Sequence, residues 1–133
     1  MSLNVEISHK AGVSVVHLRG QLTLGHAAFE LREAFTAEIQ KGFKNLVVWL
    51  DGLTIIDSTG VAVLISAFVT ASKAGGDLVI ASPSEAVRRV FLITKLFTAI
   101  GIFDTVDEAI GYFEPGTSPE TPAGGATPSP EKC

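Results

Sequence analysis

A short, uninterrupted apolar run near the middle of the chain limits which folds this sequence can adopt. Residues 45–50 read Asn-Leu-Val-Val-Trp-Leu. A run of this length and composition is typical of a strand buried on both faces, as central strands are in α/β sheets, although Trp49 can lie half exposed. Residues 77–81, Asp-Leu-Val-Ile-Ala, have the same character. The sequence therefore predicts an α/β fold with at least two buried strands.

Two further strands are predicted before this run. Residues 13–20 are rich in valine and end in a glycine, Gly20, which is the composition of a strand. Residues 4–8 are expected to pair beside it as an edge strand, with the connecting turn at Lys10-Ala11-Gly12. The chain is thus expected to begin with a hairpin.

Three segments have the spacing of amphipathic helices, and a short fourth helix is expected over residues 107–113. The first covers residues 28–39, with apolar residues at Leu31, Phe35 and Ile39, and ends at Gly42. The second follows Gly60 and ends near Gly75-Gly76, and the third opens at Pro83-Ser84-Glu85 with Ser84 as its N-cap. The apolar positions of the second helix are Val61, Leu64, Ile65, Phe68 and Val69, and those of the third are Val87, Val90 and Phe91.

Size and composition indicate one folded domain. The 133 residues are 47% apolar, which is enough for a single core. Five of the six prolines lie between Pro115 and Pro130, where no large apolar residue occurs, so we expect residues 114–133 to form a disordered tail. Residues 1–113 are predicted to form one α/β domain, a small mixed β-sheet of four to five strands with about four α-helices packed against it.

Charge and residue usage exclude several classes of function. The 14 acidic and 10 basic residues give a net charge of −4 without any run of Lys or Arg, so nucleic acid is a poor candidate partner. No apolar stretch approaches the roughly 20 residues that span a bilayer, and no signal peptide is visible, so we expect a cytoplasmic protein without membrane insertion. One cysteine, Cys133, and three scattered histidines predict neither a disulfide within the chain nor a metal site, and we expect no cofactor.

Hydroxyl groups concentrate in the loops that follow three predicted strands, where binding sites of parallel sheets lie. These loops are Gln21-Leu22-Thr23, Asp57-Ser58-Thr59 and Ser82-Pro83-Ser84. Ser58 lies where the second helix begins, which allows two interpretations. Its hydroxyl can cap the helix by accepting a backbone N–H, or it can carry a phosphoryl group that the helix N-terminus stabilises.

The residues around Ser58 resemble a known family. The Ile56-Asp57-Ser58-Thr59-Gly60-Val61 segment is similar to the Asp-Ser-(Ser/Thr)-Gly motif of the STAS family, the bacterial anti-sigma factor antagonists. Also similar are Gly20, the Leu50-Asp51-Gly52-Leu53 approach to the motif, Gly75-Gly76 and Glu108-Ala109, so the resemblance covers residues 4–113. Many family members carry an acidic residue where this chain has Thr23, but the Leu24-Gly25-His26 that follows resembles a branch whose loop runs Leu-Thr-Leu-Gly.

The resemblance implies a partner-switching cycle. The unmodified protein would bind an anti-sigma factor, which is also a serine kinase, and phosphorylation of Ser58 would reverse that binding until a PP2C-type serine phosphatase restores the hydroxyl. Asp57, Ser58, Thr59 and Gly60 would form the partner-binding turn. From the neighbouring loops we expect Thr23 and Ser84 to contribute to the same surface.

Three alternatives were weighed against this function. A hydrolase would use Ser58 as nucleophile, but the Gly-x-Ser-x-Gly motif is absent and His26 is the one histidine expected near this edge, so we predict a protein that is not an enzyme. Nucleotide-binding glycine motifs are also absent. The stronger rival lies within the family, where members act as non-phosphorylated scaffolds or as subunits of larger assemblies, either signalling or lipid-transport complexes.

Overall fold

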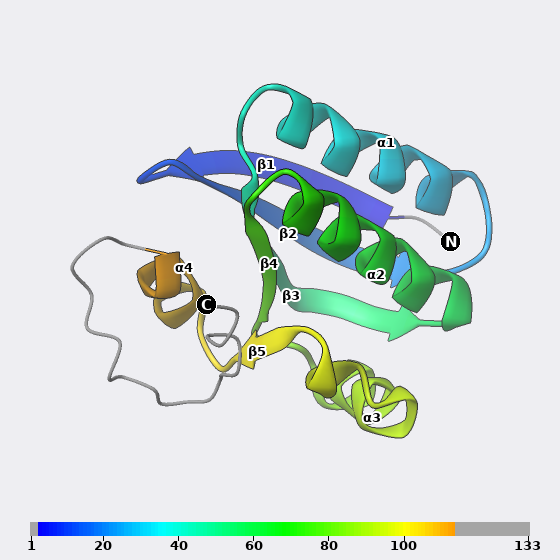
Figure 1. Ribbon diagram of the computed structural model, residues 1–133. Helices are drawn as coiled ribbons and strands as arrows, with labels where there is room; N and C mark the ends of the chain where they lie inside the picture. Colours follow the sequence, from blue (N-terminus) through cyan, green and yellow to red (C-terminus); the bar gives the residue numbers. More distant parts are fainter. Residues whose placement is uncertain (1–2, 114–133) are drawn as a thin grey trace.

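The structure, a computed structural model, describes residues 3–113; the tail predicted over residues 114–133 lies outside the described residues. The described part is one α/β domain built on a five-stranded sheet with the strand order β1-β2-β3-β4-β5 (Figure 1). The elements are β1 (Leu3–Lys10), β2 (Val13–Leu22), α1 (His26–Gln40), β3 (Asn45–Ile56), α2 (Ser58–Lys73), β4 (Asp77–Ala81), α3 (Glu85–Thr94), the 3-10 helix η1 (Leu96–Thr98), β5 (Gly101–Phe103) and α4 (Val106–Phe113).

The sheet is mixed, as the sequence predicts. Strands β1 and β2 form an antiparallel hairpin, whereas β2, β3, β4 and β5 run parallel to one another. The parallel strands therefore end at a common edge of the sheet, and in Figure 1 α1 and α2 both begin at that edge. This arrangement brings the loops after β2 and β3 together.

Helices cover the two faces of the sheet unequally. Leu31, Leu64 and Phe91, one from each of α1, α2 and α3, share one core with Val48 of β3. The preceding strand residue, Val47, points to the opposite face and belongs to a second, smaller core with α4. Alternate side chains of β3 thus enter different cores, which explains why its sequence is continuously apolar instead of alternating.

Strand β2 is longer than the valine-rich segment that predicts it. We expected it to end at Gly20, but pairing with β3 continues to Leu22. Gly20 has φ of +103° and lies at a register shift between the two strands, where β3 carries one extra residue, Thr54, between the partners of Gly20 and Gln21. A glycine in such a segment can therefore mark an irregularity inside a strand as well as its end.

Strand β3 is also longer than predicted. It was expected over residues 45–50 but extends to Ile56, because Gly52 and Leu53 pair with Arg19 and Gly20 beyond the apolar run. Trp49 is half buried and stacks on His17 with ring centroids 3.9 Å apart, in line with the partial exposure expected for it. The extension carries the end of β3 directly to the turn at Asp57.

The C-terminal part of the domain departs from the sequence prediction in two details. Strand β5, which pairs with β4, is the fifth of the four to five strands expected, but no segment of the sequence was assigned to it, and Val90 is partly buried instead of belonging fully to the core. Ser84 caps α3 as predicted, since its Oγ accepts the backbone N–H of Val87 at 3.3 Å. The left-handed cap expected after the second helix is also present, because Gly75 has φ of +91°.

Candidate functional site

The loops after β2 and β3 are held together by the carboxylate of Asp57. Its Oδ1 accepts the backbone N–H of Gly60 at 3.0 Å, and its Oδ2 accepts the backbone N–H of Leu24, also at 3.0 Å. The backbone N–H of Asp57 in turn donates to the carbonyl oxygen of Leu22 at 3.3 Å. One residue therefore caps α2 and fixes the β2–α1 loop beside it.

The same hydrogen bonds keep Asp57 ionised. Desolvation at the sheet edge raises the pKa of this carboxyl, but backbone hydrogen bonds from Gly60, Leu24 and Thr59 favour the charged form and outweigh it. The pKa of Asp57 therefore lies below its ordinary value of 3.8. A fixed negative charge stands at the start of α2, where the helix dipole stabilises it.

Ser58 does not cap α2. It is the first residue of the helix and is exposed, and its hydroxyl makes no hydrogen bond within residues 3–113, because Asp57 takes the capping position. The capping interpretation of Ser58 is therefore wrong. The hydroxyl is therefore exposed and has no structural task in the described part of the chain.

Gly60 is required by close packing, not by an unusual backbone angle. A Cβ at this position would lie 2.6 Å from the carbonyl oxygen of Leu22 and 2.6 Å from Cγ1 of Ile56. Both distances are shorter than real Cβ contacts, and the carbonyl belongs to a strand that cannot move freely. The first turn of α2 thus lies directly on the end of β2.

The other predicted site residues have different surroundings. Thr23 is half buried and lies between Leu22 and Leu24, both of which are hydrogen-bonded to Asp57, so the structure brings it to the Asp57–Ser58 turn. The hydroxyl of Ser84 donates to the carbonyl oxygen of Leu53 at 3.0 Å besides capping α3. A role for these residues in partner binding stays a prediction.

The exposed face of α2 was not anticipated from the sequence. Ile65 and Val69, which were expected among the apolar positions of this helix, are each 42% exposed. Together with Ser58 and Ala62 they form a line at helical spacing along the solvent side, which we call the α2 stripe. The only charged residue of α2 is Lys73 at its end, and this absence of charge is the signal that could have identified the stripe.

His26, the histidine expected at this edge of the sheet, pairs with a carboxylate and not with Ser58. Nε2 of His26 lies 2.9 Å from Oε2 of Glu30, and within residues 3–113 no hydrogen bond joins Ser58 to a histidine. Across that same range no three His, Cys, Asp or Glu side chains are grouped as metal ligands. Nor does any helix of the described segment combine the length and the apolar character needed to cross a membrane.

Comparisons with known proteins agree with this geometry. The STAS domain family model matches residues 4–109, which contain the Asp57–Ser58 turn and all of the five-stranded mixed sheet but its first residue, Leu3. The chain belongs to the STAS domain family.

Two relatives illustrate the sequence similarity. The anti-sigma-B factor antagonist of Bacillus subtilis is 30% identical over 102 residues, covering 77% of this chain and 92% of its own length. The anti-sigma F factor antagonist of Paenibacillus polymyxa is 27% identical over 115 residues, covering 86% of this chain and 97% of its own length.

Solved structures show the same fold. The anti-sigma factor antagonist SpoIIAA in its unphosphorylated form superposes with a TM-score of 0.70 at 24% identity, covering 80% of this chain and 93% of that one. The Bacillus SpoIIAA in its phosphorylated form gives a TM-score of 0.67 at 22% identity, covering 84% of this chain and all of that one.

Proposed function

We propose that this protein is an anti-sigma factor antagonist that binds an anti-sigma factor serine kinase through the α2 stripe and is released when Ser58 is phosphorylated. The observation that carries the proposal is the position of Ser58. Its hydroxyl is exposed, has no hydrogen-bond partner within residues 3–113, and stands at the head of an apolar helix face. The names of the relatives support the same function.

Phosphorylation would act through charge. A phosphoserine carries about −1.5 to −2 charges at pH 7. Asp57 already occupies the N–H of Gly60, so the new group would stand beside an existing carboxylate at the end of the apolar surface. A partner that buries this surface must then desolvate two neighbouring anions, which is costly. A loss of about 2.7 kcal/mol in binding free energy would weaken the complex about a hundredfold.

The exposure of Ser58 also allows the phosphoryl group to be removed. A PP2C-type serine phosphatase needs access to the phosphorylated residue, and Ser58 lies in the first turn of a helix at the sheet edge, not inside the domain. Asp57 and Thr59 flank it, Thr23 lies beside the turn, and these residues would contribute to the same interface, while the buried Gly60 would act by shaping the turn. We place the protein in the cytoplasm, where sigma factors act.

The test combines mass spectrometry with binding. Purified protein is incubated with ATP and purified candidate anti-sigma factors of the same host, one at a time, and the intact mass is followed. We expect a gain of one phosphoryl group that Ser58→Ala abolishes and the neighbouring Thr59→Val retains. Ser58→Asp should weaken binding of the anti-sigma factor, whereas Ser58→Ala should bind like the unmodified protein.

Two results would contradict the proposal. Phosphorylation at a residue other than Ser58 would move the switch elsewhere. Unchanged binding by Ser58→Asp, with no phosphoryl gain for any candidate kinase, would favour the scaffold, a non-phosphorylated subunit of a larger assembly.

A further inference from the structure

The β2–α1 loop presents a large apolar side chain to solvent beside the proposed switch. Leu24 is 79% exposed, the highest value among the large apolar residues that are exposed in residues 3–113. Exposed leucines on surfaces are common and need no explanation by themselves. What distinguishes Leu24 is how its backbone is held.

The backbone on both sides of Thr23 is hydrogen-bonded to Asp57. The carbonyl oxygen of Leu22 accepts the N–H of Asp57, and the N–H of Leu24 donates to the Asp57 carboxylate. A loop residue normally loses conformational freedom when a partner orders it, at a cost of about 0.5–1.5 kcal/mol for a side chain. Here two hydrogen bonds to Asp57 hold the loop backbone in the free protein, so a partner has to order only the side chain of Leu24 and not the loop that carries it.

The surroundings of Leu24 indicate which partner surface fits. Residues 20–31 and 53–72, which contain the loop and most of α2, carry only two charged residues, Glu30 and Asp57, and both are acidic. A complementary surface is therefore apolar and free of acidic side chains, since an acidic one would be repelled. It also has to be continuous with the surface that covers the α2 stripe, because Asp57 joins the loop to the start of α2.

We propose that Leu24 is an anchor that inserts into an apolar pocket of the anti-sigma factor, and that Asp57 is the positioning residue that holds it beside Ser58. This inference rests on the proposed function and specifies the contact surface of the partner. It assigns to Asp57 a task beyond capping α2. The motif then contributes to binding in two ways. Ser58 provides a hydroxyl that can be modified, and Asp57 holds the backbone of the loop that carries the hydrophobic contact.

The first experiment measures affinity for the anti-sigma factor that the unmodified protein binds. Leu24→Ser should raise the dissociation constant about thirtyfold, the effect of losing a central apolar contact. Leu92→Ser is the matched control, because Leu92 is also an exposed leucine, at 57%, but lies on α3. It should change the dissociation constant less than about twofold. Thermal unfolding of both variants should match that of the unmodified protein.

The second experiment asks whether Asp57 acts through Leu24. Asp57→Ala should weaken binding, and the double variant Asp57→Ala/Leu24→Ser should bind no more weakly than the weaker of the two single variants. If Asp57 contributed only its charge or only its cap, the two fold-changes would multiply. Multiplied effects would therefore overturn the positioning role of Asp57.

Failure of the anchor and failure of the proposed function give different results. If the unmodified protein binds an anti-sigma factor and Ser58→Asp weakens that binding, but Leu24→Ser binds normally, the anchor is refuted and the switch stands. If the unmodified protein binds no anti-sigma factor of its host, the proposed function itself fails and the anchor fails with it.

Discussion

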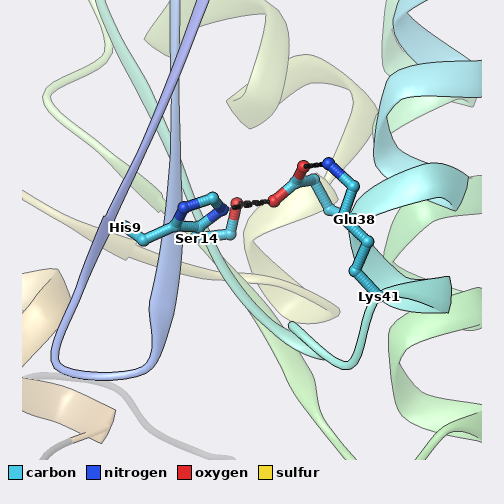
Figure 2. A network of polar contacts seen from close by, with 4 residues as sticks. All are labelled: His9, Ser14, Glu38 and Lys41. Carbon is cyan, nitrogen blue, oxygen red and sulfur yellow. Dashed lines mark hydrogen bonds and ion pairs between the residues drawn. The ribbon is translucent and has the colours of Figure 1, made fainter.

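Replacing Glu38, a buried acidic residue of α1, should destabilise the domain far more than replacing an exposed one. Glu38 is only 3% exposed and both of its carboxylate oxygens are used (Figure 2). Oε1 lies 2.7 Å from Nε2 of His9 and accepts the hydroxyl of Ser14 at 2.9 Å, and Oε2 accepts Nζ of Lys41 at 3.2 Å. The carboxylate thus connects both strands of the hairpin to α1.

The expected cost of Glu38→Ala follows from what each partner would lose. Ser14 is fully buried, so its hydroxyl would be left unsatisfied at a cost of about 1–3 kcal/mol. His9 and Lys41 are substantially exposed and can turn to water, so they add about 0–1 kcal/mol each. We expect a loss of about 1–5 kcal/mol in the free energy of unfolding, measured by urea denaturation.

The control and the refuting results are defined by the same contacts. Glu33→Ala changes an exposed glutamate of the same helix and should alter stability by less than about 0.5 kcal/mol. Adding Ser14→Ala to Glu38→Ala should recover about 1 kcal/mol, because the orphaned hydroxyl is removed. If Glu38→Ala cost no more than Glu33→Ala, or if Ser14→Ala recovered nothing, this account of the cluster would be wrong.

The contribution of Glu38 should also depend on pH. Desolvation raises the pKa of Glu38. Hydrogen bonds from His9, Ser14 and Lys41, together with the charge of Lys41, lower it by more, so the pKa in the folded state lies below the ordinary 4.5. The folded state therefore binds this proton more weakly than the unfolded state. The stabilisation is complete above pH 4.5 and is lost as the pH falls through the lower, folded-state pKa. The stability difference between the unmodified protein and Glu38→Ala should shrink across that acid range.

Three further substitutions test the edge that carries the proposed site. Gly60→Ala should cost about 1–3 kcal/mol in urea denaturation, because its Cβ would meet the carbonyl of Leu22. Gly111→Ala is the control and should be neutral or stabilising, because nothing lies within 4 Å of the new Cβ. Equal effects of the two substitutions would contradict the packing argument. Asp57→Ala should cost about 1 kcal/mol through loss of the α2 cap, and the cost should diminish in acid as the carboxyl of the unmodified protein protonates; a pH-independent cost would contradict the role of its charge. Ser84→Ala should likewise cost about 1 kcal/mol by thermal unfolding, and no change would show that the cap of α3 is dispensable.

The parts of the fold that local sequence determines could be predicted, and those that depend on distant neighbours could not. β4 has the predicted bounds, Asp77–Ala81, since a buried strand leaves a continuous apolar run. β5 contains only three residues and is ordered by pairing with β4, so its own composition carries little signal. The contact between His9 and Glu38 joins residues 29 positions apart, and nothing in either neighbourhood indicates it.

The candidate site divides in the same way. The motif located the turn at residues 57–60, but which residue caps the helix depends on where the helix begins, and sequence patterns place such ends only to within one or two residues. The exposure of Ile65 and Val69 was missed because α2 is apolar on nearly all sides. Periodicity then cannot tell the side that faces the sheet from the side that faces water. The absence of charge marks α2 as unusual, but the packed domain is needed to tell which side is exposed.

The unengaged hydroxyl of Ser58 has a consequence for how such proteins can diverge. Because it makes no hydrogen bond within residues 3–113, its loss would leave the fold and the Asp57 cap intact. A serine codon and an alanine codon can differ by one nucleotide. Under the proposed function, a regulated binder and a constitutively active one are then a single mutation apart. Because that mutation does not change folding stability, selection would act on regulation alone.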